Sequence, residues 1–396
     1  MGSAVEPAAQ RVSTRFDALQ EADYALPADV AGNVLSPALV VHMDKVRSNL
    51  RTVIEHCGGA DRWRPHVKTT KIPAVFAEVA RAGVRHFKCA TTREAALLCD
   101  ALRREGILGG DSLLAYPLVG PALTRLGRIA QEFPETQLSV LCEEPARVAH
   151  VAEELGVFVD VNPGMNRTGI PVADHASILA VVRAAGASFR GVHFYDGHLH
   201  NGAAHERRRA AFACYEQLLE LLAVLKADGH DVSEVITSGT PTFLHALAFE
   251  AFSAAECPKH RVSPGTVVYH DLRTEQENLE LDLAPAATVF TRVVSHPRDG
   301  LATCDAGSKS IAAEAGDPCA FVIGHPELVA QPPNEEHLPL HVTSGKRPAR
   351  GAHLHLVPMH VCPTVNLAEQ AILLDAGEVQ DVVPVSARAH ELLLDA

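Results

Sequence analysis

The chain lacks several features that would place it in a broad class at once. No stretch of about 18 consecutive apolar residues occurs among its 396 residues, which argues against a membrane-spanning helix. The segment Met1–Arg11 has no apolar core of the kind that a secretion signal requires. Lysine and arginine form no block, and the formal net charge is -13, so no surface for nucleic acid or an anionic membrane is indicated. We expect a cytoplasmic protein with a small-molecule partner, no nucleic acid and no membrane.

The cysteines are scattered rather than paired. Nine are present, an odd number, and none forms a CxxC pair, which argues against a disulfide framework and against a zinc finger. Free cysteine often packs as a small hydrophobic residue, so we expect most of the nine to be buried thiols. Cys362 is the exception, because it belongs to a motif with chemical meaning.

From Trp63 onward, strand-like and helix-like segments alternate along the chain. Amphipathic stretches with apolar residues three and four apart occur at Ile72–Ala82, Thr92–Arg104, Glu144–Leu155 and Ala203–Leu225. Short β-branched runs lie between them, at 63–68, 86–91, 112–117, 138–142, 158–162, 191–197, 234–239 and 261–268. Regular alternation predicts a parallel sheet, and about eight such units are what a closed (β/α)8 barrel requires.

After Asp282 the pattern changes to strand-like pieces broken by proline and glycine, with no helices between them. This pattern predicts an antiparallel β domain. The segment Ala38–His42 reads as a strand without a place in the barrel, so we expect it to pair with that domain. The predicted fold class is therefore α/β, with an N-terminal segment (1–43) that is partly a strand of the β domain, a barrel (44–280) and a C-terminal antiparallel β domain (281–396).

Barrel enzymes place their reactive groups where strands end and the following loops begin. Loops rich in glycine and hydroxyl groups after strands seven and eight are the usual phosphate site of this architecture, because backbone N–H groups can approach the anion. A phosphorylated ligand is therefore expected. The polar residues at these strand ends are Lys68 and His66 after the first strand, Asn162 and Arg167 after the fifth, Asp196, His198 and His200 after the sixth, Ser238, Gly239 and Thr240 after the seventh, and Gly265 and Thr266 after the eighth.

A single lysine, Lys68, faces this anion-binding region in the predicted barrel. A lysine that forms a Schiff base must lose its proton and needs a carbonyl group nearby, which a partly desolvated, cationic barrel mouth beside a phosphate site favours. The combination predicts pyridoxal 5′-phosphate bound to Lys68. Arg167, if aimed at the pyridine nitrogen, would keep that nitrogen unprotonated. The ring would then be a weaker electron sink, so other groups, notably a metal, must assist the reaction. Taken alone, each feature has an ordinary explanation, such as a turn, a solvated lysine or a surface ion pair.

At these residues the sequence resembles the fold-type III pyridoxal-phosphate enzymes, and within them the D-threonine aldolase and D-serine dehydratase group. The resemblance, over about residues 36 to 385, implies an alanine racemase-like barrel, a β domain built from both chain ends, and a homodimer. It also implies that His66 and Tyr195 contact the cofactor. The motifs that carry it are RPHVKTTK (64–71) around the lysine, DVNPGMNRTGI (160–170) around the arginine, TSGTPT (237–242) and SPGT (263–266) at the phosphate, and CDAGSKSI (304–311) with EEHLPL (335–340) in the β domain.

A metal site is implied by PMHVCPTVNL (358–367), which resembles the metal motif of this group and places His360 and Cys362 as ligands. Side chains two apart on a strand share one face, so a strand here would bring imidazole and thiolate to one ion. Without the resemblance the pair is weak, because two ligands do not fill a coordination shell. Water and the substrate's hydroxyl complete the shell in this group. A thiolate favours zinc, with manganese or magnesium as alternatives.

Two reactions on a D-β-hydroxy amino acid fit these residues. In a dehydratase, Lys68 removes the Cα proton while the metal binds the leaving β-hydroxyl, and keto acid and ammonia result. In an aldolase, a base takes the β-hydroxyl proton and the Cα–Cβ bond breaks to glycine and an aldehyde. By resemblance, cysteine as the second ligand goes with the D-serine and D-threo-3-hydroxyaspartate dehydratases and aspartate with the D-threonine aldolases. Cys362 therefore favours dehydration.

The sequence departs from the pattern of the group at two positions. Thr70 stands where many relatives have a second histidine, and Asp196 where several have histidine or glutamine. The base therefore stays open between His198 and His200, for which surface or core roles are equally compatible. A pyridoxal-phosphate carrier is the alternative without catalysis, although such proteins lack the second domain. An amino-acid racemase would need a tyrosine base, for which the sequence offers no clear candidate.

Overall fold

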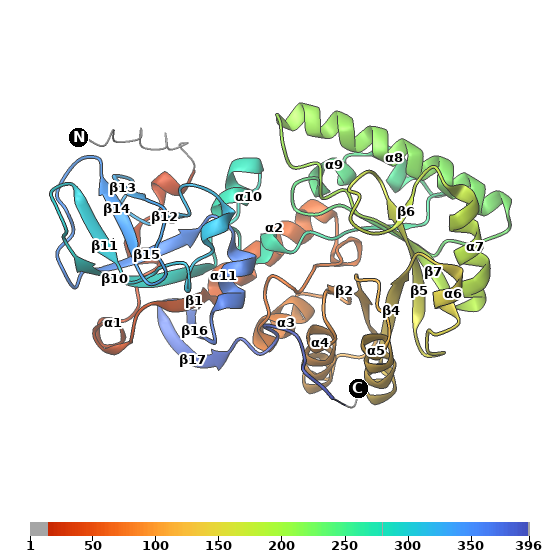
Figure 1. Cartoon of the computed structure of the whole chain (residues 1–396), viewed down its shortest axis with the longest axis horizontal. Helices are drawn as coiled ribbons and strands as arrows, with labels where there is room; N and C mark the ends of the chain where they lie inside the picture. The colour runs from red at the N-terminus through yellow and green to blue at the C-terminus, as the bar shows by residue number, and fades with distance from the viewer. Residues whose placement is uncertain (1–14, 279, 395–396) are drawn as a thin grey trace. The chain divides into compact units, whose positions relative to one another are not determined.

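Two structural units, each built from two separate stretches of chain, make up the computed structural model (Figure 1). The structure describes residues 15–278 and 280–394, so the segment Met1–Arg11, in which no secretion signal was expected, lies outside the described residues. The described parts of Met1–Ser48 and Val268–Val385 form one unit. Asn49–Val267 and the described part of Ser386–Ala396 form the other. The described residues between 268 and 280, expected in the barrel, therefore belong to the first unit.

The unit that begins at Asn49 contains the parallel barrel, and the predicted (β/α)8 fold is confirmed. One position differs from the prediction. The expected first strand, 63–68, contributes only isolated bridges, from Trp63 to Val262 and from His66 to Lys88, because Pro65 has no N–H and a turn starts at Val67. The strands pair in the order β2 (His86–Cys89), β3 (Gly110–Leu114), β4 (Thr136–Cys142), β5 (Gly156–Asn162), β7 (Phe189–Phe194), β8 (Glu234–Thr237) and β9 (Lys259–Val262), and β6 (Ile170–Pro171) pairs with β5.

Helices follow most strands and lie on the outside of the ring in Figure 1. They are α2 (Met43–Cys57), which begins in the first unit, α3 (Pro73–Arg81), α4 (Thr92–Arg104), α5 (Pro121–Glu132), α6 (Pro145–Val148), α7 (His175–Ala185), α8 (Ala204–Ala227) and α9 (Phe243–Leu247). The helix expected over Glu144–Leu155 was wrong beyond Val148. Most side chains of this stretch are exposed, so no buried apolar face stabilises a longer helix.

The inside of the barrel is filled by side chains at alternate strand positions. An apolar layer contains Leu113, Leu141, Phe158 and Ile236, all buried. Toward the starts of the strands, Arg64 donates to both carboxylate oxygens of Glu234 at 2.7 Å. The barrel interior is therefore a packed core, closed by charged side chains at the starts of the strands. A ligand site can form only at the opposite end, where the strands end.

The other unit is the predicted antiparallel β domain. Its six strands β11 (Leu301–Cys304), β14 (Leu338–Val342), β13 (Leu328–Ala330), β12 (Ala320–Val322), β15 (His353–Pro358) and β10 (Ala287–Ser295) close on themselves because β10 also pairs with β11. The strand expected at Ala38–His42 forms as β1 and lies between β10 and β16 (Gln370–Asp375), and β17 (Glu378–Pro384) is the edge strand. The helices of this unit are α1 (Ala28–Asn33), α10 (Leu272–Glu277) and α11 (Val361–Leu367).

Short 3-10 helices connect several of these elements. They lie at Arg15–Ala18, Glu21–Asp23, Ala60–Arg62, Gly186–Ser188, Glu250–Ser253, Thr266–Val268 and Ala313–Ala315. No helix among residues 15–278 and 280–394 is long and apolar enough to cross a membrane.

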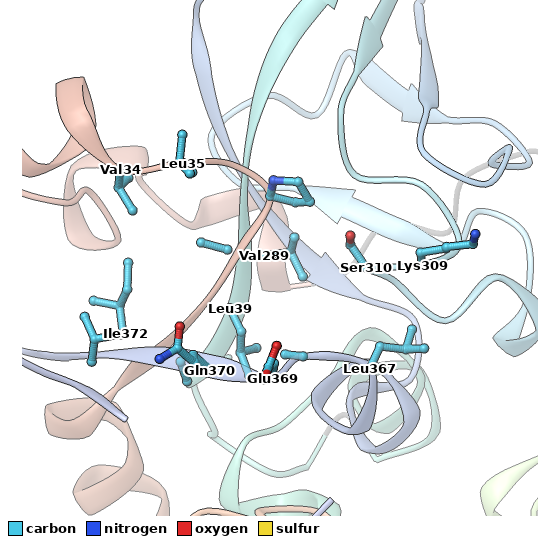
Figure 2. A pocket seen from close by; sticks show the side chains of 15 residues that line it. Val34, Leu35, Leu39, Val289, Lys309, Ser310, Leu367, Glu369, Gln370 and Ile372 are labelled. Atoms are coloured by element: carbon cyan, nitrogen blue, oxygen red, sulfur yellow. The ribbon is translucent and has the colours of Figure 1, made fainter. Parts of the chain in front are cut away.

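A groove of about 460 Å³ opens on the unit that contains β1 (Figure 2). Figure 2 shows Lys309 and Ser310 on one side of it and Val34 and Leu35 on the other. None of the residues that line it is a predicted site residue, so the groove forms no part of the candidate site.

Candidate active site

Lys68 lies in the turn Val67–Thr70, called here the Lys68 turn, which follows the irregular first barrel segment. Its neighbours Val67 and Thr69 are buried, whereas the Lys68 side chain is exposed. The next lysine, Lys71, is buried, and its amine donates to Oε1 of Glu94 at 2.7 Å. Lys71 is therefore held in an ion pair, and Lys68 is the lysine whose amine can meet a ligand.

His66 precedes this turn, and Nδ1 of its imidazole accepts a hydrogen bond from the backbone N–H of Lys68 at 3.4 Å. Burial lowers the pKa of His66 well below its ordinary value, and the charges of Lys68, Lys88 and His193 act in the same direction. The imidazole is therefore neutral at physiological pH, and it positions the turn rather than carrying a charge.

The two candidate phosphate loops, 237–242 and 263–266, pack closely against the rest of the site. A Cβ atom at Gly265 would lie 2.5 Å from the carbonyl oxygen of His66, and one at Gly239 would lie 3.0 Å from the Tyr195 ring. Buried Ser238 has a φ of 57°, a left-handed conformation that turns the backbone sharply. Gly265 is therefore needed for its loop to approach the backbone of His66, and a side chain at Gly239 would press on the Tyr195 ring.

Thr240 and Thr266 lie in the same loops, at the positions that the sequence indicated. Thr240 is 9% exposed, and Thr266 begins a short 3-10 helix. The structure thus brings the loops after β8 and β9 to the Lys68 turn, and their small residues fit a phosphate group.

Arg167 lies in the loop after β5, where its guanidinium carbon is 5.3 Å from the ring centroid of Tyr195. Oδ1 of Asn162 accepts hydrogen bonds from the backbone N–H groups of Gly164 and Asn166, which fixes the path of this loop. Arg167 itself is exposed. The arrangement places a cation over an aromatic ring that also lies against Gly239, so Tyr195 joins Arg167 to one candidate phosphate loop.

The residues after β7 divide into buried and exposed groups. Asp196 is buried and accepts hydrogen bonds from the hydroxyls of Tyr215, at 2.6 Å, and Thr242, at 2.7 Å. Burial raises the pKa of Asp196, although both hydrogen bonds act against the rise. Because both of its oxygens accept hydrogen bonds, this buried carboxyl group ties a candidate phosphate loop to α8.

His198 and His200 lie in the turn that follows. A Cβ atom at Gly164 would lie 3.4 Å from Nε2 of His198, so this ring lies against the Arg167 loop. His200 is exposed, and its Nδ1 is 3.2 Å from the carbonyl oxygen of Gly197. Of the two imidazoles, the structure brings His198 to the site and leaves His200 in solvent.

Lys88 is a residue of this region that the sequence reasoning missed. It is 2% exposed, and its amine lies 2.7 Å from Oγ of Ser263, 3.2 Å from Nε2 of His193 and 5.1 Å from the Tyr195 ring centroid. The sequence did contain a signal for this residue, namely a lysine within a predicted strand of a parallel barrel. Such strands are buried on both faces, so charged residues are uncommon in them.

Three potential metal ligands, His86, Asp111 and Glu234, gather at the starts of the barrel strands among the residues described. Arg64 lies 2.9 Å from Asp111 and 2.7 Å from Glu234, and Arg261 lies 2.8 Å from Glu234. Burial alone would raise the pKa of Asp111, but the guanidinium groups beside it hold that pKa below the usual range. A metal ion would meet guanidinium groups here, so this cluster is an ion-pair network.

His360 and Cys362 lie in the β-domain unit, and the explanation offered for their convergence was wrong. They are not on a strand: β15 ends at Pro358, His360 has an extended backbone, and Cys362 lies in the first turn of α11. Asp271 fixes this junction, because its Oδ2 accepts the backbone N–H of Val361 at 2.9 Å. Burial opposes protonation, yet a side-chain hydrogen bond with Cys362 raises the pKa of His360. Imidazole and thiol therefore meet, as two ligands of one ion would.

Comparisons with known proteins agree with this architecture. Residues 41–272 match the family model for the alanine racemase N-terminal domain, and residues 286–374 match the model for a putative serine dehydratase domain. A D-threonine aldolase of Arthrobacter sp. is 29% identical over 380 residues, covering 92% of this chain and 95% of the relative.

Two further similarities concern a dehydratase and a solved structure. A D-threo-3-hydroxyaspartate dehydratase of Delftia sp. (strain HT23) is 25% identical over 364 residues, covering 83% of this chain and 91% of the relative. The crystal structure of D-threonine aldolase from Filomicrobium marinum superposes with a TM-score of 0.78 at 25% identity, covering 90% of this chain and 96% of that one.

Proposed function

This chain belongs to the alanine racemase N-terminal domain family, in the fold-type III group of pyridoxal-phosphate enzymes, and from that premise we propose that it is a metal-assisted lyase of D-β-hydroxy amino acids. The observation that carries the proposal is the exposed Lys68 amine on a turn that packs against Gly265 of a phosphate loop. The similarity to a D-threonine aldolase and to a dehydratase of a hydroxy amino acid supports the substrate class.

The residues around Lys68 would hold pyridoxal 5′-phosphate. Bound there, the cofactor would supply an electron sink for charge that develops at the substrate's Cα. Lys68 would bind it covalently, Arg167 would face the pyridine nitrogen and keep it unprotonated, and His66 and Tyr195 would complete the contacts. The phosphate would be held by Ser238, Gly239, Thr240, Gly265 and Thr266.

Two groups of the chain would move protons. Lys68 would take the proton from Cα once the substrate has displaced it from the cofactor. His198, which lies against the Arg167 loop, is the better placed of the two histidines to act at the β-hydroxyl, and His200 would serve at most at the rim of the site. Asp196 would keep the phosphate loop in place through Thr242.

His360 and Cys362 would hold a divalent metal, zinc being favoured by the thiolate and manganese or magnesium being the alternatives. The metal would act as a Lewis acid at the substrate's β-hydroxyl. Two protein ligands alone would not fill the coordination shell of such an ion, so it could also bind the substrate's hydroxyl. The proposal further includes a cytoplasmic homodimer.

Dehydration to keto acid and ammonia is the first of two candidate reactions, and Cys362 as a soft second ligand favours it. Cleavage to glycine and an aldehyde is the second, and the 29% identity to a D-threonine aldolase favours it. A product assay with D-serine, D-threonine and D-threo-3-hydroxyaspartate separates them, because ammonia with keto acid indicates a dehydratase and glycine with aldehyde an aldolase.

Lys68→Ala should lose the visible absorption of the lysine-bound cofactor and all lyase activity, because no other exposed lysine lies on the Lys68 turn. The measurement is the absorption spectrum with borohydride trapping and peptide mapping. The trapped cofactor should be found on the peptide that contains Lys68. Its recovery on Lys71, which is paired with Glu94, would overturn the assignment.

A further inference from the structure

Lys88 is a buried lysine without a carboxylate in contact, which is unusual because a buried ammonium group is costly unless it is paired. Among the described residues no ion pair includes Lys88, and the groups within hydrogen-bond distance of its amine are Oγ of Ser263 and Nε2 of His193. The carboxylate of Asp160 contacts Nδ1 of His193, at 2.8 Å, instead of Lys88. Such an arrangement destabilises the fold, so a functional reason for it should be sought.

A chain of hydrogen bonds connects Lys88 to the candidate phosphate loops. Ser263 accepts from Lys88 and donates to the carbonyl oxygen of Ser238 at 2.9 Å. Ser238 is the residue with a left-handed backbone in the loop after β8. On the other side, Asp160 and His193 extend the chain across β5 and β7. Lys88 therefore stands at the centre of a network across the barrel, and the path through Ser263 leads to the phosphate loop.

The charges around Lys88 are mostly positive. Burial and, second to it, the charge of Lys68 lower the pKa of Lys88 to about 7, and Asp160 acts in the opposite direction. The charge of Lys88 therefore changes within the physiological range, as a surface lysine's does not. The titratable and charged groups that face it are Arg64, His66 and Lys68 from the first barrel segment and its turn, Asp160 and Arg167 from β5 and its loop, and His193 and Tyr195 from β7 and its end.

We propose that Lys88 is a positioning residue of the cofactor site, which holds the phosphate loop through Ser263. The inference deepens the proposed function and rests on it, because it concerns how the same site holds its cofactor. When Lys88 is charged, it strengthens the hydrogen bond to Ser263 and adds a cation below the phosphate site.

The test begins with the protein free of cofactor. In Lys88→Met, which keeps the length and apolar stem of the side chain, one lysine that titrates near neutrality should vanish from the NMR titration of ¹³C-labelled lysine. Pyridoxal phosphate should then bind about tenfold more weakly at pH 6, as expected when one charged hydrogen-bond donor is lost, and with a smaller deficit at pH 8.5. The control Lys259→Met removes an exposed lysine at the start of β9 and should change neither measurement.

Two further variants separate positioning from mere packing. Ser263→Ala should weaken cofactor binding while the lysine that titrates near neutrality remains. Lys88→Arg keeps the charge at every pH and should reduce the difference in affinity between pH 6 and pH 8.5. If wild-type protein shows no visible absorption of a lysine-bound cofactor, this inference falls together with the proposed function. If that absorption is present and Lys88→Met binds the cofactor like wild type at both pH values, this inference alone is overturned.

Discussion

Replacing Gly265 by alanine should separate the Lys68 turn from the phosphate loop by a distance that can be worked out. The new Cβ would lie 2.5 Å from the carbonyl oxygen of His66, whereas carbon and oxygen in contact are commonly about 3.3 Å apart. The loop or the turn must therefore shift by about 0.8 Å, and such overpacking costs about 1–3 kcal/mol of stability. A misplacement of about 1 Å commonly reduces a reaction about a hundredfold. We expect cofactor affinity and turnover to fall by about one to two orders of magnitude.

The assay is titration of the protein with pyridoxal phosphate, followed by the visible absorption, together with thermal unfolding. Gly32→Ala is the control, because a Cβ at Gly32, in the short helix α1, meets no atom within 4 Å. It should leave affinity unchanged and stability unchanged or slightly higher, since alanine favours a helix over glycine. Wild-type affinity in Gly265→Ala would show that the loop and the turn need not touch, which would refute the reasoning.

Two predictions concern the β-domain unit. Chelation, or His360→Ala, should abolish turnover but leave cofactor binding and the melting temperature nearly unchanged, because the metal would serve the substrate and not the fold. Cys362→Asp should retain the metal and shift the products toward glycine. Full activity after exhaustive chelation would contradict a role of the metal in turnover. Burial of Glu275 acts against ionisation, yet hydrogen bonds from His270 and Arg15 lower its pKa to about 2. The ionised Glu275 therefore stabilises the folded protein above the unfolded pKa of about 4.3, and this stabilisation is lost as the pH falls toward 2. Glu275→Gln should make the melting temperature decrease less steeply with falling pH. A decrease as steep as that of wild type would contradict this prediction.

The barrel could be predicted because its helices and strands differ in the period of their apolar residues. The helix Thr92–Arg104 has the predicted bounds, since the side chain of Thr91 caps its start. The helix expected after Glu144 ends early because its side chains are exposed, which the sequence of that segment does not reveal. The sequence pattern also predicted a regular first barrel strand over 63–68. In the structure Pro65 and the turn that follows interrupt it, and only isolated bridges form.

The candidate site was predictable where its residues lie close together in sequence. Lys68 and the glycines of the two candidate phosphate loops stand in short motifs that can be found without coordinates. The network of Lys88, Asp160 and His193 could not be found in this way, because its members lie on three strands and meet only through the register of the barrel. Equally, the approach of Cys362 to His360 depends on a helix that starts between them.

The path of the chain has a consequence for synthesis on the ribosome. Strand β1 leaves the ribosome before any strand of the barrel, but its partners β10 and β16 follow only after the whole barrel has been made. During that time its apolar residues have no partner and are open to wrong pairing, a hazard for chains of this size. The tail then returns to the barrel, where Ala387 donates its N–H to the carbonyl oxygen of Lys71. The first unit can therefore be complete only after β16 and β17 have been made, and the contact of Ala387 with Lys71, in the segment that carries the candidate catalytic lysine, forms later still.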